Sequence, residues 1–373
     1  MKKWLIGMLC VIAAVTSYGI HYVETEYAGI GLPWTTEVNL PPLPPVVNVK
    51  TNLSIEDQGT IRFPSKSPYD FSVLLTDYEN APDSVAQGDL FLPPNATADN
   101  PVPAMVILHG SGGLRNDREY EYAKLFNDMG IAAFVIDYYT PRGVTADFTY
   151  IQKTLTTSEI DIVVDAYAAL RLLGTHPLIN PKKIGVTGYS YGGMATRYSL
   201  DTRVKEILAP NIAGFAAHAD FYGPCHQTLG HNKYLPAAYL AVFGDSDNSV
   251  NPKQCETVHN AIKESGNSTE IIMIPNTGHA WENQIERKIY DAPFINNCEL
   301  SFAPNSGLPL INNMPVKYAK KGASRERRAY LRARIMMDAP ECVGRGYIMG
   351  RDDDADTVAK VALKRFLTSY LLN

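Results

Sequence analysis

The chain has 373 residues, of which 45% are hydrophobic and 20% are charged. This composition supports a large core and excludes a globally disordered chain, and the length fits one large α/β domain with additions. The formal net charge of −5 argues against a nucleic-acid binder that relies on overall positive charge.

The N-terminus has the pattern of an export signal. Two lysines precede an apolar stretch at residues 4–15, and no further charge appears before Glu24. The apolar stretch of a secretory signal has about 7–15 residues, whereas a membrane-spanning helix needs about 20. We therefore expect residues 1–25 to be the cleaved signal peptide of a periplasmic or secreted protein. An N-terminal segment that stays uncleaved as a membrane anchor is the alternative.

Residues 26–59 contain five prolines between positions 33 and 45, which predicts an extended linker. From residue 60 onwards, short apolar runs that predict strands alternate with helical spacing. This alternation predicts a parallel sheet covered by helices on both faces, formed by a main domain at 60–373. The strands are expected at 60–63, 84–92, 104–108, 131–136, 183–187, 214–219, 239–243 and 270–274. The helices are expected at 118–129, 159–173, 192–200 and 252–265.

The alternation stops after residue 280. Residues 281–350 hold five prolines, two cysteines and a basic stretch at 317–334, which has eight Lys or Arg against one Glu. A helix is expected at 323–336, and a C-terminal helix at 357–372. The basic stretch is interpreted as a solvated helix face, with contact to an anionic substrate, lipid or polymer as the alternative.

Four cysteines follow the N-terminal segment, which is an even number suited to an oxidising compartment. We favour the pairs Cys225–Cys255 and Cys298–Cys342, because each closes the shorter loop. Four buried thiols are the alternative. No CxxC pattern occurs and the histidines do not cluster with the cysteines in the sequence, so a zinc site is not expected.

The strongest motif is Gly188-Tyr189-Ser190-Tyr191-Gly192, a G-x-S-x-G between a predicted strand and a predicted helix. A serine on such a tight turn is lifted out of the sheet, and the flanking glycines avoid clashes there. The following helix adds free N–H groups and partial positive charge. Ser190 is therefore the candidate nucleophile.

A serine nucleophile needs a base and an acid, which follow it in the order acid, then histidine. His279 lies just after the predicted strand at 270–274 and is the candidate base. Asp245 and Asp247 both follow the strand at 239–243, and strand geometry alone does not separate them. The acid would orient the imidazole and stabilise its charged form.

An oxyanion formed during the reaction needs preorganised donors. One candidate is the backbone N–H of Tyr191, directly after the nucleophile. The second comes from His109-Gly110-Ser111-Gly112-Gly113, after the early strand at 104–108. We choose the N–H of Ser111, with that of Gly112 in reserve.

Residues 103–280 resemble the dienelactone hydrolase family of α/β-hydrolases. Five motifs carry the resemblance, in the family's order: LHGSGG (108–113), IDYYTPRG (136–143), GYSYG (188–192), GDSD (244–247) and GHA (278–280). The resemblance implies an α/β-hydrolase fold, with an eight-stranded, mostly parallel sheet flanked by helices. In this family the acid lies three residues after the glycine that ends its strand, which selects Asp247.

The chain departs from the family in two ways. The founding members use a cysteine nucleophile, whereas this chain has Ser190, so a serine esterase is expected. Family members commonly run from the histidine almost directly into the last helix, whereas the 70 residues 281–350 intervene here. We expect this insertion to form a lid or a wall of the pocket and to determine substrate choice.

The expected function is therefore cleavage of carboxylic esters by a serine hydrolase through an acyl-enzyme intermediate, with Ser190, Asp247 and His279 as catalytic residues. A peptidase or thioesterase could use the same triad, and a non-catalytic binding protein could use the same fold. We expect no cofactor and no metal. The expected partner is a small-molecule ester rather than nucleic acid, with membrane contact only if the N-terminal segment stays uncleaved.

Overall fold

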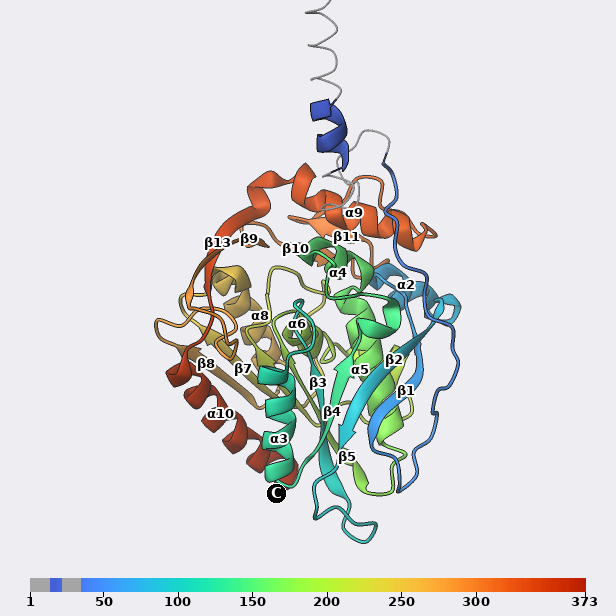
Figure 1. The fold of residues 1–373 in the computed structure, drawn as a ribbon, viewed down its shortest axis with the longest axis vertical. Coiled ribbons are helices and arrows are strands. Elements are labelled where there is room, and N and C mark those ends of the chain that lie inside the picture. The colour runs from blue at the N-terminus through green and yellow to red at the C-terminus, as the bar shows by residue number, and fades with distance from the viewer. Residues whose placement is uncertain (1–13, 22–34) are drawn as a thin grey trace, which may run out of the picture.

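The computed structural model describes residues 14–21 and 35–373 (Figure 1). Most of the expected signal segment, residues 1–25, therefore lies outside the described residues. Within the described part of the chain, no helix is both long enough and apolar enough to cross a membrane. Residues 35–58 run along the body without helix or strand.

The centre of the molecule is an eight-stranded sheet in the order β1-β2-β4-β3-β5-β6-β7-β8. The pairs β1–β2 and β2–β4 are antiparallel, and all other neighbours in this sheet are parallel. The predicted mostly parallel, eight-stranded sheet is confirmed. Its strands are β1 (Gly59–Lys66), β2 (Asp83–Phe91), β3 (Val102–Leu108), β4 (Ala132–Asp137), β5 (Ile179–Tyr189), β6 (Ala217–Phe221), β7 (Ala238–Gly244) and β8 (Thr269–Ile274).

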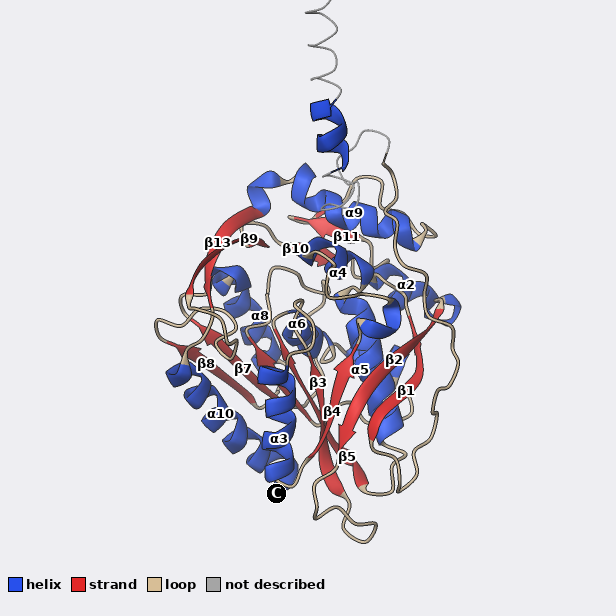
Figure 2. Cartoon of the chain, in the orientation of Figure 1, coloured by secondary structure: helices blue, strands red, loops and turns tan. Residues whose placement is uncertain are grey.

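Helices flank this sheet, as the blue ribbons around the red strands in Figure 2 show. One hydrophobic cluster joins the sheet to α5, α6 and α7, and a second joins it to α3, α8 and α10. Successive residues of β3 alternate between the two clusters, because neighbouring side chains of a strand point to opposite faces. The helices are α2 (Phe71–Asp77), α3 (Glu121–Asp128), α4 (Tyr150–Thr156), α5 (Glu159–Leu173), α6 (Tyr191–Tyr198), α7 (Thr202–Leu208), α8 (Pro252–Glu264), α9 (Arg325–Asp338) and α10 (Asp353–Leu367).

Helix α5 has the predicted bounds because Ser158 caps it and forms a capping box with Asp161. Helix α10 begins at Asp353 rather than at the predicted residue 357. The reason is that Asp352 is its N-cap and the acidic residues that follow form the first turn, where the helix dipole favours them. The short helices α2, α4 and α7 were not predicted, since seven residues give too little periodicity.

The insertion at 281–350 is folded and lies at one end of the molecule, around α9 (Figure 1). Strands β9 (Lys288–Ile295) and β13 (Val343–Met349) form an antiparallel pair. Strands β10 (Leu300–Phe302), β11 (Pro309–Ile311) and β12 (Met314–Pro315) form a small separate sheet. Helix α9 follows and leads back to β13.

The interpretation of the basic stretch as a solvated face is wrong for three of its arginines. Arg332 pairs with buried Glu159 at 2.6 Å, and Arg328 approaches Asp70 at 3.1 Å. Arg325 donates to two backbone carbonyl oxygens and is buried. These arginines hold α9 on the body, which a charge pattern alone does not reveal.

Both predicted disulfides are confirmed. Cys225 is bonded to Cys255, and Cys298 to Cys342. The first links the segment after β6 to α8, and the second joins the end of β9 to the start of β13. Two structural disulfides indicate an oxidising compartment.

Candidate active site

Ser190 is the single residue between β5 and α6. Its backbone has φ 54° and ψ −111°, a strained conformation for a residue with a side chain. The flanking glycines are required by packing. A Cβ at Gly188 would lie 2.1 Å from the carbonyl oxygen of Gly192, and one at Gly192 would lie 2.3 Å from that of Leu108. The G-x-S-x-G pattern thus reflects a turn packed against the end of β3.

His279 connects the serine to an acid. Its Nε2 lies 2.9 Å from Ser190 Oγ, and its Nδ1 lies 2.6 Å from Asp247 Oδ2. Asp247 is fully buried and His279 is 5% exposed, so water competes little for this pair. The three groups come from the ends of β5, β7 and β8, which meet at one edge of the sheet because these strands are parallel.

The structure brings Asp247 rather than Asp245 to the histidine. Asp245 is exposed and accepts a hydrogen bond from Ser246 Oγ at 2.9 Å. Asp247 Oδ1 accepts from both the backbone N–H and the hydroxyl of Ser249, at 3.0 and 2.5 Å. These bonds fix the carboxylate and leave Oδ2 for the imidazole.

The loop at 109–113 lies beside the serine. A Cβ at Gly110 would be 3.5 Å from Ser190 Cβ. Two tyrosines that follow β4 hold this loop. The Tyr138 hydroxyl donates to the carbonyl oxygen of His109, and the Tyr139 hydroxyl donates to the carbonyl oxygen of Ser111 at 3.1 Å. Gly110 therefore lies next to Ser190, and Ser111, the residue predicted to supply an oxyanion-hole N–H, follows it directly in this loop. The N–H of Tyr191, in the first turn of α6, has no place in the helix's own ladder.

The insertion contacts the histidine directly. The N–H of His279 donates to Ile348 O in β13 at 2.8 Å, and the N–H of Gly350 donates to His279 O at 3.2 Å. The Tyr347 ring stands edge-on to the imidazole, with 5.5 Å between centroids. A single parallel β-bridge between His279 and Met349 thus joins the histidine loop to β13.

A buried polar cluster packs behind the imidazole. The Tyr222 ring lies edge-on to His279 at 4.7 Å, and its hydroxyl donates to Glu282 Oε2 at 2.7 Å. Burial raises the pKa of Glu282 to about 7, although the Arg118 charge and the Tyr222 hydrogen bond act in the opposite direction. Glu282 therefore changes its charge near neutral pH.

A second buried network reaches the residue after the nucleophile. The hydroxyl of Tyr191 donates to Glu159 Oε2 at 3.1 Å, and Arg332 Nη2 lies 3.1 Å from the same hydroxyl. Gln227 donates to Glu159 Oε1 at 2.7 Å. Burial alone would raise the pKa of Glu159, but Arg332 and these hydrogen bonds outweigh it and hold the pKa below its ordinary value.

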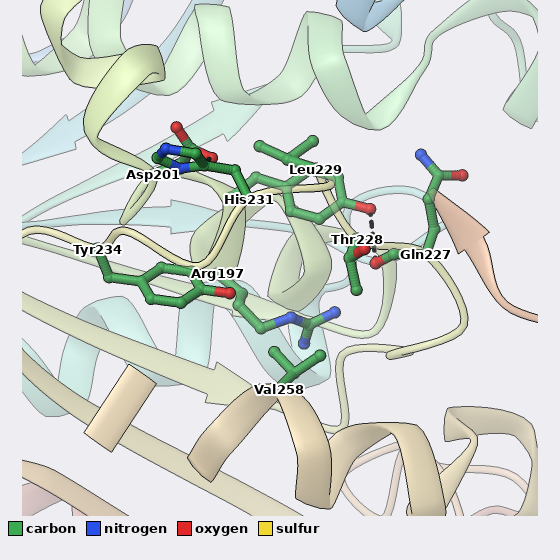
Figure 3. Close-up of a pocket in the computed structure, with 9 residues that line it drawn as sticks. Arg197, Asp201, Gln227, Thr228, Leu229, His231, Tyr234 and Val258 are labelled. Atoms are coloured by element: carbon green, nitrogen blue, oxygen red, sulfur yellow. Dashed lines mark hydrogen bonds and ion pairs between the residues drawn. The ribbon is translucent and has the colours of Figure 1, made fainter. Parts of the chain in front are cut away.

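Neither a small cavity beside α6 nor the disulfide region offers a second site. Figure 3 shows the small cavity between Arg197, Asp201, His231 and Tyr234. Its volume of about 10 Å³ is near the minimum for one water. Among the described residues, Cys225, Cys255 and His259 are the one group of His, Cys or carboxylates close enough to hold a metal. The sulfurs of Cys225 and Cys255 are bonded to each other in a disulfide, so they cannot bind a metal as thiolates.

Sequence reasoning missed the residues around the triad. Glu159, Arg332 and Tyr347 act through long-range contacts, and no spacing rule connects them or Ser249 to Ser190. One usable signal existed for Ser249, because a serine two residues after an aspartate commonly bonds its carboxylate.

The sheet and the serine turn define the α/β-hydrolase fold. The family model described as "Dienelactone hydrolase family" matches residues 88–296. The chain belongs to this family, and it is accordingly a hydrolase that acts on ester bonds.

Individual relatives are distant. A protein named "Putative carboxymethylenebutenolidase" from Yersinia pestis is 22% identical over 195 residues, which cover 48% of this chain and 69% of that protein. "Uncharacterized peptidase YuxL" from Bacillus subtilis is 22% identical over 224 residues, but the match spans only 33% of its length and 52% of this chain. A propionate-bound esterase from Thermogutta terrifontis is 18% identical, with a TM-score of 0.43, and the match covers 52% of this chain and 80% of that one.

Proposed function

We propose that this protein cleaves carboxylic esters through an acyl-enzyme on Ser190. The observation that carries the proposal is the His279 imidazole, which lies within hydrogen-bond distance of Ser190 Oγ on one side and of the Asp247 carboxylate on the other. A half-buried hydroxyl, a buried imidazole and a buried carboxylate in this order form the arrangement that activates a serine.

Acylation begins when Ser190 Oγ attacks the ester carbonyl carbon and its proton passes to His279 Nε2. Asp247 accepts the Nδ1–H, which fixes the tautomer and stabilises the imidazolium. The N–H groups of Ser111 and Tyr191 donate to the oxyanion, and each such donor contributes about 3 kcal/mol to the transition state in comparable enzymes. Collapse breaks the ester C–O bond, and the imidazolium proton goes to the leaving alcohol.

Deacylation repeats these steps with water. His279 accepts a proton from water, the oxygen attacks the acyl carbon, and the acid leaves as Ser190 regains its proton. Because Ser249 holds Asp247 and β13 holds the histidine loop, the base keeps its orientation through both halves.

We further propose an exported protein, periplasmic or secreted, with residues 1–25 as signal or anchor, 26–59 as an extension and 60–373 as the hydrolase domain. The two disulfides support an oxidising location. The contacts of β13 and α9 with His279 and Tyr191 support a role for 281–350 as a wall of the pocket.

The test is hydrolysis of p-nitrophenyl acetate by the wild-type protein and by Ser190→Ala, with thermal melting as the control for folding. We expect Ser190→Ala to lose hydrolysis while its melting temperature stays nearly unchanged. A folded variant with wild-type activity would reject Ser190. Parallel assays with a thioester and a peptide p-nitroanilide test the thioesterase and peptidase alternatives.

A further inference from the structure

A larger cavity lies between the insertion and the core of the hydrolase. Its volume is about 60 Å³, several times the roughly 10–15 Å³ that one water requires. Helix α9 and residues 302–323 form one side, and the starts of α2 and α5 form the other. Figure 1 places α9 across the end of the molecule that holds this cavity.

Most of the cavity wall is apolar. Phe302, Leu308, Leu331 and Ile335 line it. The two arginines in the wall are each close to a carboxylate, Arg328 to Asp70 and Arg332 to Glu159. The remaining charged residue of the wall, Lys320, is exposed to solvent. Because the buried charges are paired and most of the wall is apolar, the cavity suits an uncharged, mainly apolar group.

Tyr69 adds one unsatisfied polar atom to this wall. The residue is 2% exposed, and its hydroxyl has no hydrogen-bond partner among the described residues. Burial raises the pKa of Tyr69 well above its ordinary value, so the phenol stays protonated and can donate. A buried donor without an acceptor is destabilising, and a ligand oxygen would satisfy it.

The cavity is connected to the nucleophile through one side chain. Glu159 and Arg332 line the cavity, and both hydrogen-bond with the hydroxyl of Tyr191. Tyr191 directly follows Ser190 in the chain. The Tyr191 side chain thus lies between the cavity wall and the serine turn.

We propose that this cavity is the acyl subsite of the enzyme and that it takes a short, uncharged acyl chain with a hydrogen-bond acceptor for Tyr69. This inference rests on the proposed function. The acyl group stays attached to Ser190 while the alcohol leaves and water enters. A cavity between the insertion and the body therefore suits the acyl chain and leaves the other side of the serine to the alcohol.

The first test narrows the cavity with Ala323→Phe, whose side chain would occupy the space beside α9. The measurement is kcat/KM for p-nitrophenyl hexanoate and p-nitrophenyl acetate. We expect the hexanoate-to-acetate ratio to fall at least tenfold, because the longer chain loses its space. Val358→Phe, at an exposed position on α10, is the matched control and should keep the wild-type ratio. An unchanged ratio in folded Ala323→Phe would overturn the proposal.

The second test removes only the phenol oxygen, with Tyr69→Phe. The substrates are p-nitrophenyl levulinate and p-nitrophenyl pentanoate, which differ by a ketone on the same acyl chain. We expect the wild-type protein to prefer levulinate and the variant to lose about tenfold of that preference. If Tyr69→Phe keeps the preference, or the wild type has none, the hydrogen bond to Tyr69 is rejected.

These outcomes separate the two proposals. If the wild-type protein hydrolyses none of the p-nitrophenyl esters, the proposed function fails. If it hydrolyses acetate but neither cavity variant changes the substrate ratios, the esterase stands and the acyl subsite is wrong.

Discussion

Arg332 of the insertion helix α9 hydrogen-bonds with the hydroxyl of Tyr191, the residue that follows Ser190, at 3.1 Å. The same guanidinium pairs with Glu159 at the start of α5. One arginine therefore links the insertion, the start of α5 and the serine turn. The 281–350 segment is coupled to the site by charge as well as by the backbone contacts of β13.

Arg332→Ala should lower stability and disturb the serine turn. It removes the counter-charge of Glu159, whose carboxylate is buried, and we expect the free energy of unfolding to fall by about 2 kcal/mol. The Arg332 side chain is 29% exposed, which keeps the loss below that of a fully buried pair. Denaturant unfolding measures the change.

Two further variants interpret this result. Arg334→Ala breaks a pair with exposed Asp338 on the same helix, so we expect a loss of only about 0.3–0.5 kcal/mol. Glu159→Gln combined with Arg332→Ala should recover part of the stability, because the uncompensated charge is gone. Equal losses for Arg332→Ala and Arg334→Ala would contradict the role assigned to Arg332.

Ser249→Ala should weaken catalysis by more than its loss of stability explains. Ser249 donates twice to Asp247 Oδ1, and its hydroxyl oxygen lies 3.3 Å from His279 Nδ1. A hydrogen bond to a charged group contributes about 1.5–3 kcal/mol, so loss of the hydroxyl should lower kcat about tenfold while KM changes little. Ser246→Ala, which loses only a bond to exposed Asp245, is the control. A fall in melting temperature that accounts for the whole activity loss would reduce Ser249 to a structural residue.

Asp247→Asn should reduce kcat far more than Asp245→Asn. An amide at 247 cannot stabilise the imidazolium and favours the wrong tautomer, and the corresponding change in a well-studied serine protease costs about 10⁴-fold. Asp245 is exposed and bonds its neighbour, so its amide should leave kcat within about twofold, as expected for a surface change. Steady-state assays on p-nitrophenyl acetate decide the ranking, and the reverse order would reassign the acid.

Glu282 should make stability fall as the pH rises. Its pKa is about 7 in the folded protein, against an ordinary value of 4.5. Between these values the folded state holds a proton that the unfolded chain has lost, so stability is greatest below pH 4.5 and decreases up to about pH 7. The difference corresponds to about 3 kcal/mol at neutral pH.

Glu282→Gln removes this titration and keeps an acceptor for Tyr222. We expect the variant to gain stability relative to the wild type as the pH rises from 4.5 to 7, with no further gain above that range. Denaturant unfolding across pH 4–8 measures the difference, and exposed Glu264→Gln is the control. Parallel pH curves for wild type and Glu282→Gln would show that the carboxyl titrates normally.

The sequence predicted the parts of this molecule that local rules govern. Both ends of helix α5 were predicted to the residue. The reason is that its N-cap and its apolar residues lie within one continuous stretch of the sequence, so local rules are sufficient. The serine turn and its neighbouring strands were predicted for the same reason, since the glycines at 188 and 192 serve local packing. The eight-stranded, mostly parallel sheet followed from the family resemblance.

The insertion was not predictable in the same way. Its strands β10, β11 and β12 have two or three residues each, too few for a pattern. The Arg332 side chain pairs with Glu159, which lies 173 residues earlier in the chain, so its environment cannot be predicted from neighbouring residues. Charge counting treated the arginines of α9 alike, although Arg325 is buried and the other arginines of the helix are half-buried.

The central claim is that Ser190 is the nucleophile, and a fluorophosphonate probe tests it most directly. We expect intact-mass analysis to show one adduct on the wild-type protein, peptide mapping to locate it on Ser190, and folded Ser190→Ala to take up none. A folded wild-type protein that remains unlabelled, or an adduct on a different residue, would contradict the account.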